Sequence, residues 1–465
     1  MPKLEHTTLL IVRRLLCSLG WVSEPKGDFF ISRKFSRLAI SALLAALSIT
    51  ACHKKAASAS ESSSQSFRET ARSAFDFINS IGINTHLNYF DRLYGNFPLV
   101  QRELASLGIL HLRDGVHLQN ADYNAAVYGR WAQLGKLGLR FDAVVDPRNK
   151  LGPITPDLLE KVYLLSDRTI ESFEGPNEMD ISGTSNWSTI DRDFNDTLYR
   201  AVHQMPDADR VKLIGPSMAF ASHGHQIGDI SGRNDFGNLH SYPAGKLPST
   251  IFPEQTELAK DLSGSHAIIM TESGYHNALN DHTDQPAISE TAAAKYVPRL
   301  FLENYVHGIL RTYLYELLDE APDPGLKDNQ LHWGLIRANG TEKPAFTALK
   351  NLISELNDHS KPAHLDSLTW SLSNTASKID HILLEKSNGE FDLILWQEVP
   401  SFDTKDQVDI SNPPVKAVLT FPYKVKSVRL YEPAIQATPT HSYSEASTFP
   451  VDIPDHPLVI QILKP

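Results

Sequence analysis

The chain has 465 residues, with 55 acidic and 44 basic side chains, so its formal net charge is −11. This excess of negative charge argues against nucleic acid as the main partner, because phosphate binding needs a basic surface. Hydrophobic residues make up 41% and charged residues 21%, as in ordinary globular proteins, and two cysteines exclude a disulfide framework and a zinc site built on thiolates.

The first predicted feature along the chain is an export signal. Basic residues at positions 33, 34 and 37 precede an apolar stretch, residues 38–51, which is too short to span a bilayer but suits the core of a signal peptide. Residues 49–52 resemble a bacterial lipobox, and this resemblance implies that Cys52 is acylated and becomes the new N-terminus. A plain secretory signal with an incidental cysteine is the alternative.

We therefore expect residues 1–51 to be an N-terminal extension and lipoprotein signal peptide. The serine-rich segment that follows is typical of a flexible linker, so residues 52–70 are predicted to be a tether. The expected location is the cell envelope of a bacterium, as an exported lipoprotein that touches the membrane only through its lipid anchor.

Eight short apolar or β-branched segments then alternate with helix-patterned stretches at a mean spacing of about 33 residues. These strand candidates are 81–87, 109–115, 140–146, 171–178, 211–218, 236–243, 267–274 and 311–318. One strand and one helix repeated eight times predict an α/β fold, a (β/α)8 TIM barrel over residues 71–357. A doubly wound open sheet is the alternative, but the glycine-rich turn after its first strand is missing here.

Polar residues stand at the carboxyl ends of most predicted strands, where a closed barrel would gather them at one mouth. They are His86, Arg113, Asp146, Glu178, His240 and Glu272. From residue 358 to residue 465 the pattern changes to short alternating strands separated by turns, which predicts a small all-β sandwich without an active site of its own.

Glu178 and Glu272 end the fourth and the seventh predicted strands, which lie roughly across the barrel mouth from each other. Hydrolysis of a glycosidic bond needs two carboxyl groups that flank the anomeric carbon, one to protonate the leaving oxygen and one to attack or to activate water. Either glutamate alone could be a solvated loop acid or a helix cap, but the pair at these two strands favours catalysis.

In this arrangement the chain resembles clan A of the retaining glycoside hydrolases, over residues 75–355. Asn177-Glu178 matches the acid/base site of that clan, Glu272 its nucleophile, and Arg113 the arginine beside the nucleophile. The C-terminal domain is similar to that of the xylosidase- and iduronidase-like branch.

His240-Ser241-Tyr242 also matches a clan pattern, in which the tyrosine donates a hydrogen bond to the nucleophile. With Arg113 and Tyr242 beside it, Glu272 is expected to stay ionised, and Glu178, close to that charge, to stay protonated as the acid. Asn177 would hold the sugar 2-hydroxyl, and the two carboxyl groups should lie about 5–5.5 Å apart.

Four further residues are candidates for binding the sugar. His86 and Asp146 lie at the predicted mouth, where a structural role is equally compatible with the pattern. The resemblance implies a tryptophan at the end of the eighth strand, and since the sequence has none there, Trp333 in the following loop is the candidate replacement. Trp187, in the polar loop after the fourth strand, is the candidate for stacking on sugar.

These features predict a retaining glycoside hydrolase that acts on an oligo- or polysaccharide by double displacement. The alternative is a non-catalytic carbohydrate-binding protein of the cell envelope on a glycosidase-like barrel. No cofactor and no metal are expected, because no carboxylate stands at ligand spacing from the pair His223 and His225.

Overall fold

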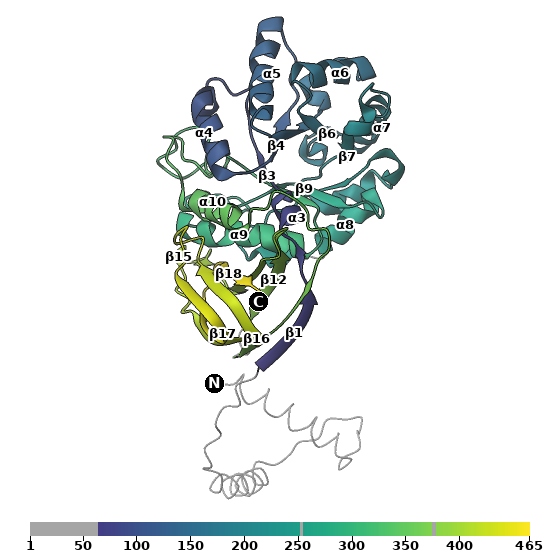
Figure 1. Ribbon diagram of the computed structural model, residues 1–465. Helices are drawn as coiled ribbons and strands as arrows, with labels where there is room; N and C mark the ends of the chain where they lie inside the picture. The colour runs from purple at the N-terminus through teal and green to yellow at the C-terminus, as the bar shows by residue number, and fades with distance from the viewer. Residues whose placement is uncertain (1–63, 252–253, 374–377) are drawn as a thin grey trace, which may run out of the picture. The chain divides into compact units, whose positions relative to one another are not determined.

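The computed structural model describes residues 64–251, 254–373 and 378–465, coloured in Figure 1. The predicted signal peptide, Cys52 and the first part of the predicted tether lie outside these residues. In the described parts of the chain, no helix is both long enough and apolar enough to cross a membrane.

The first domain is the predicted barrel, a sheet of eight parallel strands in the order β7-β6-β5-β4-β3-β10-β9-β8. The ring closes between β7 and β8 through a parallel bridge from Ile214 to Phe236. Its strands are β3 (Ile81–Asn84), β4 (His111–Gly115), β5 (Arg140–Val144), β6 (Ile170–Glu174), β7 (Lys212–Ile214), β8 (Gly237–His240), β9 (Ile268–Ser273) and β10 (Arg311–Leu314). Each strand starts within two residues of the sequence-based expectation.

Helices cover the outside of this barrel (Figure 1). They are α3 (Ala74–Ile78), α4 (Phe97–Leu107), α5 (Ala121–Gly135), α6 (Pro156–Leu165), α7 (Trp187–Val202), α8 (Glu254–Ser263), α9 (Glu290–Val306) and α10 (Pro344–Leu356). Most begin at a capping side chain, as in α4, where Asn96 accepts from the Leu99 amide. The β7–β8 connection is the exception to the repeat, since it holds only the 3-10 turns η5 (Ala221–Gln226) and η6 (Ser231–Arg233).

The second domain is built on eight strands, seven of them in the order β1-β11-β16-β18-β13-β12-β2, with β17 paired to β16. Its strands are β1 (Ser64–Thr70), β2 (Arg72–Ser73), β11 (Ser367–Ser373), β12 (Ile379–Glu385), β13 (Phe391–Gln397), β16 (Val415–Tyr431), β17 (His441–Ile453) and β18 (Leu458–Leu463). The long strand β16 pairs with β11 near its start and with β18 near its end, and its ladder with β17 is irregular between Thr420 and Val425. A strand that changes partners in this way folds the sheet over the apolar core and gives the sandwich that the sequence predicts.

The structure corrects the boundary of the predicted tether, because residues 64–70 form β1 and pair with β11 along its whole length. The Phe67 ring stacks on Trp370 at 4.1 Å, and Glu69 accepts a hydrogen bond from the indole of that tryptophan. The serines on the exposed face of β1 gave this strand the composition of a linker. The second domain therefore contains both the segment before the barrel and the segment after it.

Helix α9 joins the two domains. Arg299 on this helix is fully buried and donates hydrogen bonds to the Glu398 carboxylate at 2.5 Å and to the backbone of the second domain. The Trp396 indole of the second domain is in hydrogen-bond range of Glu303, which lies on α9, and of Glu398, which lies in its own domain. Since α9 follows β9 in the chain, the second domain supports the helix behind the strand that carries Glu272.

Candidate active site

A cavity of about 270 Å³ opens at the carboxyl ends of the barrel strands. Most of its wall comes from the segments that follow β3, β4 and β5, and Asn177, Glu272 and Tyr315 complete it. Arg113, Asp146 and His86, which the sequence analysis selected, also line this cavity. The predicted mouth of the barrel is therefore hollow and lined largely by polar groups.

Glu272 ends β9 with both carboxylate oxygens engaged. Arg113 Nη1 donates to Oε1 at 2.6 Å, and the Tyr242 hydroxyl donates to Oε2 at 2.7 Å. Burial alone would raise the pKa of Glu272, but the charges of His240 and Arg113 and the hydrogen bond from Tyr242 together bring it below its ordinary value. Glu272 is thus held as a carboxylate.

The guanidinium of Arg113 is the centre of the polar network below the cavity. Its N–H groups donate twice to Glu174, at 2.6 and 2.8 Å, and once each to Glu272, Asn177 and Asn84. Burial opposes the charge of Glu174, yet the contact with Arg113 lowers the pKa of Glu174 to about 2. Arg113 therefore fixes the carboxylate of Glu272 and the amide of Asn177 relative to each other.

Glu178 follows β6 in a left-handed backbone conformation, with φ of 47° and ψ of 48°. Such a conformation is unfavourable for a residue with a side chain and persists where neighbouring contacts hold it, as happens at many functional sites. The Glu178 amide donates to the Ser217 carbonyl at 3.0 Å, and its carboxylate lies 2.8 Å from His240 Nδ1. Both contacts hold the strained residue in place.

The hydrogen bonds of His240 determine where a proton lies beside Glu178. Thr271 Oγ1 is 2.9 Å from His240 Nε2, and the Thr271 hydroxyl donates onward toward Asn238 or Glu174. Since this hydroxyl must accept from Nε2, the contact between Nδ1 and Glu178 carries one shared proton. Burial lowers the pKa of His240, but the charge of Glu272 and the contact with Glu178 raise it above its ordinary value overall.

The two predicted catalytic glutamates lie close together. Glu178, His240 and Glu272 each have one potential ligand atom, a carboxylate oxygen or an imidazole nitrogen, and these atoms are within 4.8 Å of one another. This donor set does not suit a metal ion, because both oxygens of Glu272 are already engaged and the Arg113 cation is 2.6 Å from one of them. Two carboxyl groups at this spacing can instead act on a single carbon atom between them.

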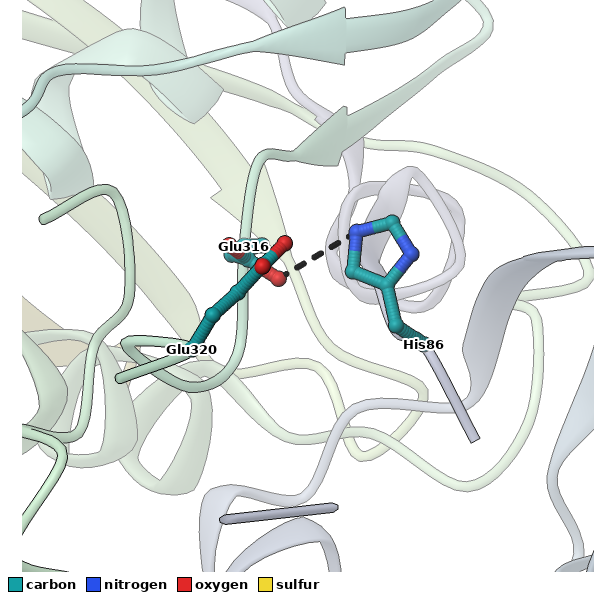
Figure 2. Close-up of side chains that lie close together, drawn as sticks. All are labelled: His86, Glu316 and Glu320. Carbon is teal, nitrogen blue, oxygen red and sulfur yellow. Dashed lines mark ion pairs between the residues drawn. The ribbon is translucent and has the colours of Figure 1, made fainter. Parts of the chain in front are cut away.

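His86 lies on the wall of the cavity, with its ring stacked on Tyr89 at 4.7 Å. Figure 2 shows the ring facing two carboxylates from the segment after β10, and the nearer oxygen, from Glu316, is 3.4 Å from Nε2. Burial lowers the pKa of His86 to about 4, and burial together with the neighbouring Glu320 raises the pKa of Glu316 well above its ordinary value. The imidazole is therefore neutral at pH 7.

The carboxylate of Asp146 contacts the backbone of the segment that carries Glu178. One carboxylate oxygen accepts from the Asn177 amide at 3.0 Å, and the carboxylate forms a two-point ion pair with Arg148, which also donates to the Asn177 carbonyl. This geometry gives Asp146 a positioning role for Asn177 and Glu178.

The two tryptophans predicted to bind sugar do not line the cavity. Trp333 is only 6% exposed and packs against Tyr242 and His276, at ring distances of 4.9 and 4.8 Å. Trp187 begins α7 and packs on the apolar cluster around Met218. Tyr315, just beyond β10, lines the cavity near the place where the resemblance implied a tryptophan.

Sequence reasoning also missed polar residues that complete the network. Glu174 and Asn84 bind Arg113, and Asn238 and Thr271 extend the contacts of His240. A signal for Glu174 was present, since it is a charged residue at the end of a short barrel strand, three positions before Asn177.

No protein-family model and no curated protein sequence matches this chain. Among solved structures, it is similar to a family 39 glycoside hydrolase from Bacteroides cellulosilyticus, with 13% identity and a TM-score of 0.58, covering 83% of this chain and 82% of that one. A monomeric β-xylosidase from Caulobacter crescentus gives 13% identity and a TM-score of 0.56, with 85% and 98% covered. A family 39 enzyme from Xanthomonas axonopodis gives 12% and 0.55, with 85% and 96% covered. The chain therefore has the fold of these glycoside hydrolases, a barrel followed by a β-domain.

Proposed function

We propose that this protein is a retaining glycoside hydrolase that cleaves an O-glycosidic bond of an oligo- or polysaccharide. The observation that carries the proposal is the pair Glu178 and Glu272, whose carboxylate oxygens approach within 4.8 Å across the barrel mouth. This spacing agrees with the retaining class, because inverting enzymes separate their carboxyl groups by about 6.5–9.5 Å to leave room for water.

In the first step, an oxygen of Glu272 attacks the anomeric carbon while Glu178 gives its proton to the oxygen of the leaving group. The bond from the anomeric carbon to that oxygen breaks, and a glycosyl ester of Glu272 forms. Arg113 and Tyr242 hold Glu272 ionised and oriented before attack. His240, which shares a proton with Glu178, stabilises the carboxylate that Glu178 becomes.

In the second step, water attacks the anomeric carbon of the ester and passes a proton to Glu178. The bond to Glu272 breaks, which restores its carboxylate and returns Glu178 to the acid form. Asn177, oriented by Arg113 and Asp146, is the proposed partner of the sugar 2-hydroxyl, a contact that strengthens in the transition state.

The test is to incubate the full chain with a panel of activated 2-deoxy-2-fluoro glycosides and to follow its intact mass. We expect a glycosyl adduct that maps to Glu272 and is absent in Glu272→Gln. Glu178→Gln should still form the adduct, because an activated leaving group needs no acid, and should release it slowly. An adduct on another residue would overturn the assignment. A second result would also overturn it: no adduct forms, yet the protein binds sugar and still binds it after both substitutions. This is the behaviour of a binding protein.

We also propose that the protein is exported and lipidated at Cys52, on the motif at residues 49–52. Growth of an expressing bacterium with radiolabelled palmitate should label the wild type but not Cys52→Ser. Label that persists in Cys52→Ser would contradict lipidation at this cysteine.

A further inference from the structure

The loops after β6 and β7 are tied together beside Glu178 by one buried carboxylate. Asp180 lies two residues after Glu178, and its side chain is fully buried. It accepts hydrogen bonds from the amides of Ala219 and Phe220, at 3.0 and 3.1 Å, and contacts His223 Nδ1 at 2.9 Å. The conformation of the loop that carries Phe220 is thus fixed to the segment of the acid/base residue.

The two loops that the Asp180 hydrogen bonds connect carry two large apolar side chains that are exposed to solvent. Phe220 is 57% exposed, more than any other aromatic side chain in the described part of the chain, and Ile181 from the facing loop is 56% exposed. Phe90, another exposed phenylalanine on a loop of the same end of the barrel, differs because the Arg130 guanidinium covers it at 4.4 Å. The Phe220 ring lies 5.1 Å from the ring of His223 and, among the described residues, has no cation over its face.

The position of this pair relative to the cavity indicates which part of a substrate would meet it. Most of the cavity wall comes from the ends of β3, β4 and β5 and the segments after them. Asn177 is the only residue of the segment after β6 that lines it, and neither Glu178 nor any residue of the β7–β8 connection belongs to the described wall. The sugar that is attacked at Glu272 fits this cavity. The leaving group departs on the side of the proton donor, where Ile181 and Phe220 follow Glu178 and Ser217 in the chain.

We propose that Phe220, Ile181 and His223 form the subsite for the leaving group and that this subsite takes a second pyranose ring. The axial C–H groups of a pyranose give it an apolar face that packs on an aromatic ring, as carbohydrate sites commonly use. If His223 donates from Nδ1 to Asp180, its Nε2 is an acceptor for a sugar hydroxyl. This inference rests on the proposed function and assigns the residues that bind the leaving sugar of its substrate.

The test uses the reverse of the first step. The enzyme is first trapped with the fluoroglycoside of the panel that labels it, and excess reagent is removed. The trapped enzyme is then incubated in buffer alone, with xylobiose or with cellobiose. An acceptor hydroxyl in the subsite attacks the anomeric carbon and gives its proton to Glu178. The bond to Glu272 then breaks, so a new oligosaccharide and free enzyme appear. The measured quantity is the rate of adduct loss with the disaccharide divided by the rate in buffer.

In the wild type at least one disaccharide should accelerate release, and Phe220→Ala should reduce that acceleration about tenfold, the loss expected for one ring contact. Phe220→Trp, which keeps an aromatic ring at this position, should show the acceleration of the wild type. Tyr423→Ala, a change at a 38% exposed ring on the second domain, is the matched control and should behave as the wild type.

Acceleration that is equal in Phe220→Ala and the wild type overturns the subsite, as does wild-type enzyme that neither disaccharide reactivates. Sugar binding without any adduct is a different result, because it overturns the proposed function before the acceptors are used. The two proposals therefore fail at separate steps of one experiment.

Discussion

Replacement of Arg113 by methionine removes the charge at the centre of the site while keeping a side chain of similar length. In the wild type this guanidinium donates two hydrogen bonds to Glu174 and one each to Glu272 and Asn84, which are all buried, and one to the half-buried Asn177. Arg113→Met would leave two buried carboxylates without their cation. Loss of one partner from a buried ion pair costs about 3–5 kcal/mol of stability, and for a domain of this size that lowers Tm by roughly 5–10 °C.

The loss should depend on pH in a defined direction. In the wild type the pKa of Glu174 is about 2 and that of Glu272 lies below its ordinary value, so their stabilisation is present above about pH 4 and is lost only as pH falls toward 2. In Arg113→Met, burial without the cation raises both pKa values, and stability is then lost as pH rises. The Tm difference between wild type and variant should therefore be small near pH 4.5 and largest near pH 8.

Differential scanning fluorimetry across this pH range measures the effect, with activity on an activated aryl glycoside measured beside it. Arg200→Met is the matched control, because its ion pair with Asp196 joins side chains that are 63% and 30% exposed, and surface pairs contribute about 0–1 kcal/mol. Arg113→Met combined with Glu174→Gln should recover much of the Tm without recovering activity. A Tm loss that is independent of pH, or equal to that of Arg200→Met, would refute the electrostatic reasoning.

Three further predictions address the nucleophile, a buried acid and the N-terminal strand. Tyr242→Phe removes the 2.7 Å hydrogen bond to Glu272 and should lower kcat by about 10–100-fold with little change in KM, measured by steady-state kinetics; an unchanged kcat would exclude the tyrosine from the chemistry. Burial first, and then two neighbouring aspartates, raise the pKa of Asp191 to about 8, so the stability of the wild type falls as pH rises from 4 through 8. Asp191→Asn should therefore have a higher Tm than the wild type at pH 8.5. A Tm difference that is as large at pH 5 would contradict this. Deletion of residues 1–70 should lower Tm by several degrees because β1 is lost, whereas deletion of residues 1–61 should not; equal melting curves would show that β1 adds nothing.

The barrel was predictable because its signal is periodic. Eight buried strands that alternate with helices leave few alternatives, and the polar ends of those strands predicted which side chains would meet. Glu178 and Glu272 could be selected because their chemistry requires a pair, and two strands on opposite sides of a barrel supply one. Since every strand of the ring is parallel, these ends gather on one face without further information.

The sequence-based predictions that failed concerned residues whose roles depend on contacts between distant segments of the chain. Residues 64–70 have the composition of a linker, and only the partner strand 297 positions away, with its Trp370, makes them a strand. Trp187 stands in a polar stretch, so its packing on Met218 could not be read from neighbours in the chain. Glu174 was missed because its role depends on Arg113 from another strand.

The pairing of β1 with β11 also constrains how the chain is made. Thr70 and Ser367 lie side by side at one end of this ladder but are 297 positions apart, and at about 5–20 residues per second a ribosome needs roughly 15–60 s to pass from one to the other. During that time β1 is a strand without its partner, an edge that can pair wrongly with another chain. The second domain can close only after β18 has been synthesised, well after the last barrel strand, so the barrel is made between two halves of a domain that is still incomplete.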